Sequence, residues 1–226
     1  MMRMLERFLN AWYGPPSGQE GPVKGAGFEV EDADLIRWWG IASRWNVPLI
    51  RFNQIVRPED LRSRDGKVVF LMENQGGAVW SFSEDPAART VFVDHGDGWS
   101  RTGLSVGDFL AQMTICEAAH GAASKFSFGD LSDAPSELIG RIAADVPSFD
   151  AGRLGWVSSE WKMYVLDDCL IDVVEHWRRP GRFEVATYFA DQARRDSWMR
   201  EIGFGSGGTV ESNPGDRGGT REAAPF

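Results

Sequence analysis

The sequence predicts a fold that combines helices with antiparallel strands. Three predicted strands follow one another with short, turn-rich connections, at 67–73, 78–83 and 90–94. Such short connections favour antiparallel pairing, because parallel strands need a long crossover. A second strand pair, 161–166 and 169–177, flanks the acidic two-residue turn Asp167-Asp168, which is typical of a hairpin. Elsewhere, apolar residues recur at helical spacing, which predicts several amphipathic helices.

The helices are marked by apolar periodicity and by residues that start or stop them. Apolar residues at helical spacing predict helices over about 4–13, 31–45, 106–121, 136–145 and 191–202. Asp32 is placed to cap the second helix and Ser105 the third, and Gly121 is a natural stop for the third. Pro58-Glu59-Asp60-Leu61 indicates a short helical turn, and a further strand is expected at 183–189.

Length and composition indicate one folded domain followed by a tail. The chain has 226 residues, 42% hydrophobic and 25% charged, which is typical of a soluble globular protein with a substantial core. We expect residues 1–202 to form a single domain. Residues 203–226 are rich in Gly, Ser, Thr, Pro and charge, and this predicts a disordered tail. A GxGxxG match at 203–208 has no strand before it and no helix after it, so it predicts no dinucleotide site.

The net charge of the chain bears on its choice of partners, although charge alone favours the simpler interpretation that it provides solubility. The formal net charge is -9 and the pI is near 4.9, so the electrostatic field repels nucleic acid and anionic membranes and attracts basic partners.

Cys116 and Cys169 lie far apart without a CxxC pattern, as expected of buried thiols in a reducing compartment. The N-terminal helix is amphipathic and unlike a signal peptide, and no apolar run reaches transmembrane length. We therefore expect a cytoplasmic protein.

One pattern has the residue types of a metal-dependent nuclease. Asp150 is followed by Glu160-Trp161-Lys162, so two carboxylates are available for Mg²⁺ and a lysine for orienting water. The alternative is that Glu160 and Lys162 share the exposed face of a strand and alternate with buried Trp161 and Met163. We prefer this alternative, because the pattern is short and the net charge disfavours nucleic acid. No histidine has metal-ligand spacing. We expect no enzymatic activity, no metal and no cofactor.

A group of carboxylates lies on the predicted C-terminal hairpin. Its members are Asp167, Asp168, Asp172 and Glu175. They are candidates for contact with a basic partner, where they would steer association. Turns also select aspartate for conformational reasons, so an ordinary polar hairpin is the alternative that we favour.

The segment 68–82 carries the most specific pattern in the chain. An apolar strand ends in Glu73-Asn74-Gln75-Gly76, and a second strand containing Trp80 follows. Further features occur in the same order around it, namely the 58–61 turn, the 90–94 strand, Trp99 and the helix start at 108–110. This ordered set resembles the SMI1/KNR4 (SUKH) superfamily, most clearly over 32–121 and more weakly over 158–202.

The resemblance implies an α+β fold with a central, mostly antiparallel sheet packed by helices. It also implies a non-catalytic role. Bacterial members resemble immunity proteins that bind and neutralise a cognate toxin, often a nuclease, and fungal relatives act in cell-wall regulation through protein contacts. No catalytic residue carries over. We therefore expect a protein-binding immunity protein, with the metal-dependent nuclease and a regulatory scaffold without a toxin partner as alternatives. The sequence does not indicate an oligomeric state.

The residues that carry the resemblance are expected to be structural. Glu73, Asn74, Gln75 and Gly76 lie at the break between two strands. We expect the amide side chains of Asn74 and Gln75 to satisfy backbone groups at this break. We expect Trp80 to pack inward.

Overall fold

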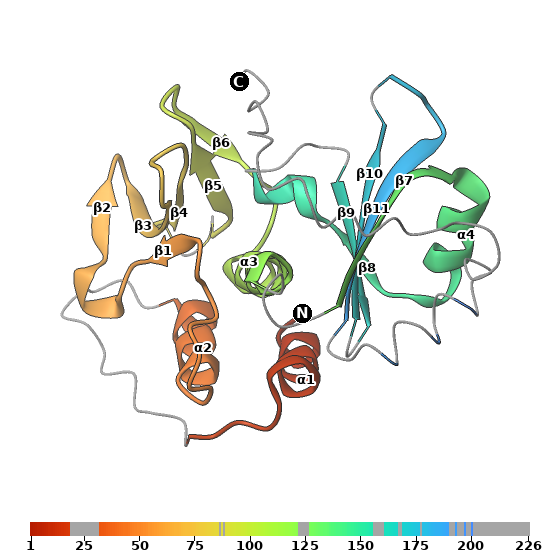
Figure 1. Ribbon diagram of the computed structural model, residues 1–226. Coiled ribbons are helices and arrows are strands. Elements are labelled where there is room, and N and C mark those ends of the chain that lie inside the picture. Colours follow the sequence, from red (N-terminus) through yellow and green to blue (C-terminus); the bar gives the residue numbers. More distant parts are fainter. Residues whose placement is uncertain are drawn as a thin grey trace.

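In the computed structural model, helices and two antiparallel sheets are stacked in four layers. The structure describes residues 1–18, 32–85, 87, 89–121, 127–155, 161–166, 169–176 and 178–189, with residues 193, 197 and 200. A first sheet (sheet A), three helices, a second sheet (sheet B) and a fourth helix follow one another across the molecule (Figure 1). The expected α+β class and antiparallel pairing are confirmed, with the strands divided between two sheets.

Sheet A contains the first six strands. They are β1 (Asn53–Ile55), β2 (Arg62–Arg64), β3 (Lys67–Glu73), β4 (Val79–Ser83), β5 (Val91–Asp94) and β6 (Trp99–Arg101). Their order is β1-β3-β4-β5-β6, and β2 pairs with β3 as well. The expected helical turn η1 (Pro58–Asp60) precedes β2. A register shift on β3 between Val69 and Leu71 accompanies the burial of both Phe70 and Leu71 in the core.

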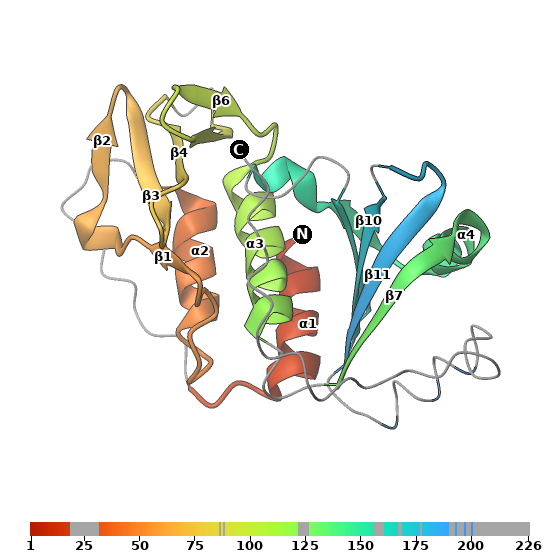
Figure 2. The same ribbon diagram turned by 45° about the horizontal axis from the view of Figure 1, so that its top comes forward.

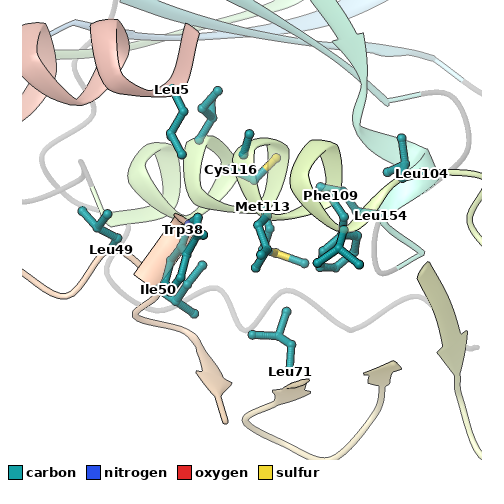
Figure 3. Close-up of a cluster of buried hydrophobic side chains, with 14 of the residues drawn as sticks. Leu5, Trp38, Leu49, Ile50, Leu71, Leu104, Phe109, Met113, Cys116 and Leu154 are labelled. Carbon is teal, nitrogen blue, oxygen red and sulfur yellow. The ribbon is translucent and has the colours of Figure 1, made fainter. Parts of the chain in front are cut away.

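Three helices fill the space between the sheets, as Figure 2 shows. They are α1 (Met2–Tyr13), α2 (Ala33–Ala42) and α3 (Val106–Gly121). α3 is central and is buried along nearly its whole length. One apolar cluster joins these helices to the inner face of sheet A and to residues of sheet B (Figure 3). The indole N–H of Trp38 donates to Thr114 Oγ1 at 2.9 Å, which fixes α2 against α3.

Sheet B and the fourth helix form the other side of the molecule. The strands are β7 (Ser127–Pro135), β8 (Ser148–Asp150), β9 (Trp161–Leu166), β10 (Cys169–Glu175) and β11 (Arg182–Phe189), in the order β7-β11-β10-β9-β8. α4 (Ser136–Asp145) lies on the far face of this sheet (Figure 2). Its Leu138 and Ile142 belong to a second apolar cluster with Ile171 and Val173. The short helix η4 (Ala151–Leu154) connects β8 to β9.

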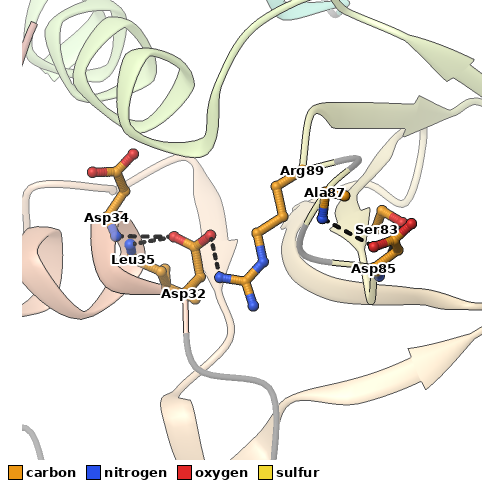
Figure 4. A network of polar contacts seen from close by, with 7 residues as sticks. All are labelled: Asp32, Asp34, Leu35, Ser83, Asp85, Ala87 and Arg89. Atoms are coloured by element: carbon orange, nitrogen blue, oxygen red, sulfur yellow. Dashed lines mark hydrogen bonds and ion pairs between the residues drawn. The ribbon is translucent and has the colours of Figure 1, made fainter.

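The expected cap of α2 is confirmed, and it also joins this helix to sheet A. The Asp32 carboxylate accepts hydrogen bonds from the backbone N–H groups of Asp34 at 3.0 Å and Leu35 at 2.9 Å (Figure 4). Its other oxygen pairs with Arg89 Nη1 at 3.3 Å. Arg89 lies between β4 and β5, so one buried carboxylate holds the start of a helix and the connection between two strands.

Several predicted boundaries match the structure, and others differ. The helices at 106–121 and 136–145 have the expected bounds, whereas the second helix ends at Ala42. The sequence patterns did not predict β1, β2, β6, β7 and β8. The tail at 203–226 and all but three residues of the predicted helix at 191–202 lie outside the described residues. None of the described helices combines the length and apolarity needed to cross a membrane.

We expect the buried thiol of Cys116 to be unreactive in the folded protein. Burial raises its pKa well above the ordinary value, and the negative charges of Asp172 and Glu117 raise it further. The folded state therefore holds this proton more tightly than the unfolded state. This contribution to stability is complete below the unfolded pKa, about 8.5, and is lost as the pH rises above it, by at most about 1.4 kcal/mol per pH unit.

Urea unfolding between pH 7 and pH 10, with iodoacetamide labelling of the folded protein, measures this effect. Cys116→Ala should flatten the decline in the free energy of unfolding on the alkaline side. Rapid labelling of Cys116 under native conditions would contradict the assignment.

Candidate functional site

The family-like segment at the β3–β4 turn is held by a carboxylate. Glu73 Oε2 accepts hydrogen bonds from the backbone N–H groups of Gln75 at 2.8 Å and Gly77 at 3.0 Å. We expected the side-chain amides of Asn74 and Gln75 to bond the backbone groups at this turn. That expectation is wrong for these two N–H groups, because the Glu73 carboxylate bonds them while Asn74 and Gln75 are exposed. A carboxylate accepts from two amides at once, which suits a turn that presents several N–H groups on one side.

Trp80 packs inward, as expected. Its side chain is fully buried, and its indole N–H donates to the carbonyl oxygen of Leu154 at 2.7 Å. Because Trp80 is on β4 and Leu154 is in η4, this bond joins sheet A to the segment that leads into sheet B. Glu73 and Trp80 thus serve the structure, because their described hydrogen bonds hold parts of this chain to each other.

The four carboxylates of the predicted acidic surface are not gathered on one described surface. Asp172 is only 6% exposed and lies close enough to Cys116 to raise the pKa of its thiol. Glu175 is exposed, and its Oε1 accepts a hydrogen bond from the backbone N–H of Gly181 at 2.8 Å. This contact closes the turn between β10 and β11. Asp167 and Asp168 lie outside the described residues.

The structure brings together two of the three residues of the nuclease-like pattern. Asp150 and Lys162 are directly opposite each other on the paired strands β8 and β9. The Asp150 carboxylate also accepts a hydrogen bond from the N–H of Gly152 at 3.1 Å and so caps η4. Glu160 lies outside the described residues. Across the part of the chain that is described, no group of three or more potential metal ligands is found.

The outer face of sheet A is the largest feature that the sequence patterns did not indicate. We use this name for the face turned away from α1, α2 and α3. Residues directly opposite each other on paired strands share a face. The register therefore places three rows here, namely Arg64-Lys67-Ser83, Arg62-Val69-Ser81-Phe92-Arg101 and Gln54-Met72-Val79-Asp94-Trp99. None of the described helices packs on this face.

Cations on the outer face of sheet A lie over aromatic rings. Lys67 Nζ is 4.2 Å from the centroid of the Phe92 ring, and the guanidinium carbon of Arg101 is 5.6 Å from the same centroid. The guanidinium carbon of Arg64 is 5.5 Å from the Trp99 ring. Each cation–π contact contributes about 0.5–1 kcal/mol at an exposed site. The contacts restrict these long side chains and keep their charges on one face.

Asp94 is the only carboxylate in the three rows, and it is already engaged. Its Oδ1 accepts hydrogen bonds from the N–H groups of Gly96 at 2.8 Å and Gly98 at 3.0 Å. Its Oδ2 pairs with Arg64 Nη2 at 3.1 Å. The Gly96 and Gly98 amides, with Arg64, hold the pKa of Asp94 below its ordinary value, so it stays ionised. The net charge that the three rows present to solvent is therefore positive.

Apolar and polar groups complete the outer face of sheet A. Met72 is 37% exposed, and Val69 and Val79 beside it are partly exposed. At the centre of the middle row, the Ser81 hydroxyl is fully buried and has no hydrogen-bond partner among the described residues. Exposed apolar side chains beside aromatics and arginines are typical of protein-binding surfaces.

One signal for this face was present in the sequence. Arg62, Arg64 and Lys67 alternate on either side of the Asp65-Gly66 turn. Period-two spacing of cations around a turn places them on one side of a hairpin. Arg101 and Phe92 join them only through the pairing of β4, β5 and β6, which spacing alone does not give.

No family model matches the chain, and no curated protein or solved structure matches it.

Proposed function

We propose that this chain is a non-catalytic, SUKH-like protein-binding module, and that it acts as an immunity protein that binds and neutralises a cognate toxin. The outer face of sheet A is the observation that carries this proposal. It combines restrained cations, aromatic rings and exposed apolar side chains, and it has no described helix packed against it. A protein partner uses all three kinds of contact at once, because arginines and aromatics supply most of the energy at such interfaces.

The architecture supports the same proposal. Antiparallel strands packed by helices fit the fold that the resemblance to the SMI1/KNR4 superfamily implies. The residues that carry the resemblance, Glu73 and Trp80, make internal contacts. A scaffold of this kind leaves its exposed face free to differ between members that bind different toxins. Inhibition then follows from occlusion of the toxin by a tightly bound partner.

Co-expression with the product of a neighbouring toxin gene tests the proposal. The chain should co-purify with that product at a stoichiometric ratio and should abolish its toxicity in cells. Binding without any rescue from toxicity would favour a regulatory scaffold. Nuclease targets are one class to test, because the resemblance implies them.

The nuclease alternative has its own test, motivated by the pairing of Asp150 with Lys162. Incubation of the purified chain with nucleic acid and Mg²⁺ should give no cleavage. Cleavage that is lost in Glu160→Ala would overturn the binding-module proposal. A cleavage signal that survives Glu160→Ala and Lys162→Ala would instead identify a contaminating nuclease.

A further inference from the structure

The outer face of sheet A has a charge opposite to that of the whole chain. The chain carries a formal charge of -9, whereas the three rows present Arg62, Arg64, Lys67 and Arg101. Their one carboxylate, Asp94, is occupied by two backbone amides and Arg64. A positive face on an acidic protein orients an approaching anionic group toward that face and away from the rest of the surface.

The shape of the charged region favours a narrow partner. The cations lie on the strands, while the carboxylates Asp65, Glu84, Asp85 and Asp97 lie in the connections around them. A broad polyanion such as a nucleic-acid backbone would meet this acidic rim and the field of the whole chain. An extended acidic segment of a protein can lie along one row and avoid the rim.

The cations of this face are already held in place before such a segment binds. Lys67 and Arg101 are held over Phe92, so less side-chain freedom is lost when a carboxylate binds to them. Arg62 Nη1 donates to the carbonyl oxygen of Leu61 at 2.7 Å, which fixes its guanidinium at the start of β2. In the same row, Ser81 is fully buried beneath the surface of the face, so the contacts with a bound segment fall to the exposed cations around it.

We propose that the outer face of sheet A binds an extended acidic segment of the toxin, whose carboxylates meet Arg62, Lys67 and Arg101. This inference rests on the proposed function and specifies the chemistry of the partner. It also changes the expectation drawn from net charge, which favoured a basic partner. Asp172 and Glu175 of the C-terminal hairpin then serve the fold, as their contacts indicate.

Charge reversal tests the proposal against a matched control. The test variant is Arg62→Glu with Arg101→Glu, and the control is Arg3→Glu with Arg141→Glu, which changes the net charge equally at exposed sites outside sheet A. Calorimetric titration with poly-glutamate, and with any toxin that co-purifies with the chain, should show about tenfold or greater weakening for the test variant, since two ion pairs become repulsive. The control should stay within about twofold, because exposed charges beyond a Debye length are screened.

Two further measurements keep the result interpretable. Thermal unfolding followed by circular dichroism checks that each variant folds. If the reversal variant is unstable, the neutral Arg62→Gln with Arg101→Gln should still weaken binding. Added NaCl should weaken the binding of the natural chain more than that of the neutral variant, which keeps only Arg64 and Lys67 on this face.

Soluble polymers test which chemistry the face binds, independently of any toxin. Poly-glutamate should bind the natural chain, poly-lysine should not compete for this face, and a single-stranded oligonucleotide should bind more weakly than poly-glutamate. Tight toxin binding that is equal in the reversal variant would overturn this inference and leave the proposed function standing. Poly-glutamate binding that depends on Arg62 and Arg101, with no toxin found, would support the face and contradict the immunity role. Stronger binding of the oligonucleotide would contradict the acidic-protein assignment.

Discussion

Replacing Glu117 by alanine is expected to lower the free energy of unfolding by about 3 kcal/mol or more, because it leaves four donors without an acceptor, two of them on the buried Asn53. Glu117 is fully buried on α3. Its Oε2 accepts from the N–H groups of Arg51 at 2.9 Å and Phe52 at 2.7 Å. Its Oε1 accepts from the backbone N–H of Asn53 at 3.1 Å and from Asn53 Nδ2 at 2.6 Å. One side chain therefore fixes the chain as it enters β1.

Glu117→Gln is the matched control, because it keeps the shape of the side chain and removes one of the two acceptor oxygens. An amide NH₂ group in place of either oxygen faces two donors, so about half of the loss seen with alanine is expected. Urea unfolding followed by tryptophan fluorescence measures both variants. Hydrogen exchange should accelerate at the amides of Phe52 and Asn53 before it changes in sheet B, because the loss is local. Changes within about 0.5 kcal/mol for both variants would mean that the site relaxes without cost.

The central elements of the fold were predictable because each carries a complete local signal. The helix at 106–121 has an apolar run, a serine before it and a glycine at its end, and its bounds match. The segment 67–73 is a long apolar strand beside a turn. The short strands lack such signals, since β1, β2 and β6 are each three residues long and mostly polar. They form through pairing with a longer neighbour, which is a tertiary effect.

The candidate site was less accessible to sequence reasoning, because the direction of a side chain depends on which faces of a sheet are covered. Asp172 lies in a predicted strand and is a candidate for contact with a basic partner on the sequence pattern alone. Sheet B is covered on both faces, by the central helices and by α4, so Asp172 within the length of β10 is buried, whereas Glu175 at its end is exposed. The four cations of sheet A come from three strands, β2, β3 and β6, and only the register places them in adjoining rows. Glu117 was visible as an acid far from the first turn of a largely apolar helix, whose other acid, Asp108, lies in that first turn; an acid at such a position indicates an internal partner.

Replacing Trp80 by alanine is expected to destabilise the fold by about 3–5 kcal/mol, the usual range for loss of a buried large aromatic. Trp80 is fully buried, and its ring lies 6.0 Å from that of Phe109 on the central helix. Trp80→Phe keeps most of the ring contact but removes the N–H that donates to Leu154 at 2.7 Å. It should cost about 1–3 kcal/mol, the penalty for a buried acceptor left unpaired. Thermal and urea unfolding measure both changes.

The Trp80 variants also distinguish residues that support the fold from residues that contact the toxin. If Trp80 only joins sheet A to η4, then Trp80→Phe lowers the unfolding midpoint but leaves toxin affinity unchanged at temperatures where the protein stays folded. Arg101→Glu on the outer face of sheet A should show the opposite behaviour, with weakened affinity and a midpoint close to that of the natural chain. A loss of affinity in folded Trp80→Phe, equal to that in Arg101→Glu, would place the family-like segment in the binding surface. The internal contacts of Trp80 argue for the first result, because a fully buried side chain reaches a partner only through the structure it supports.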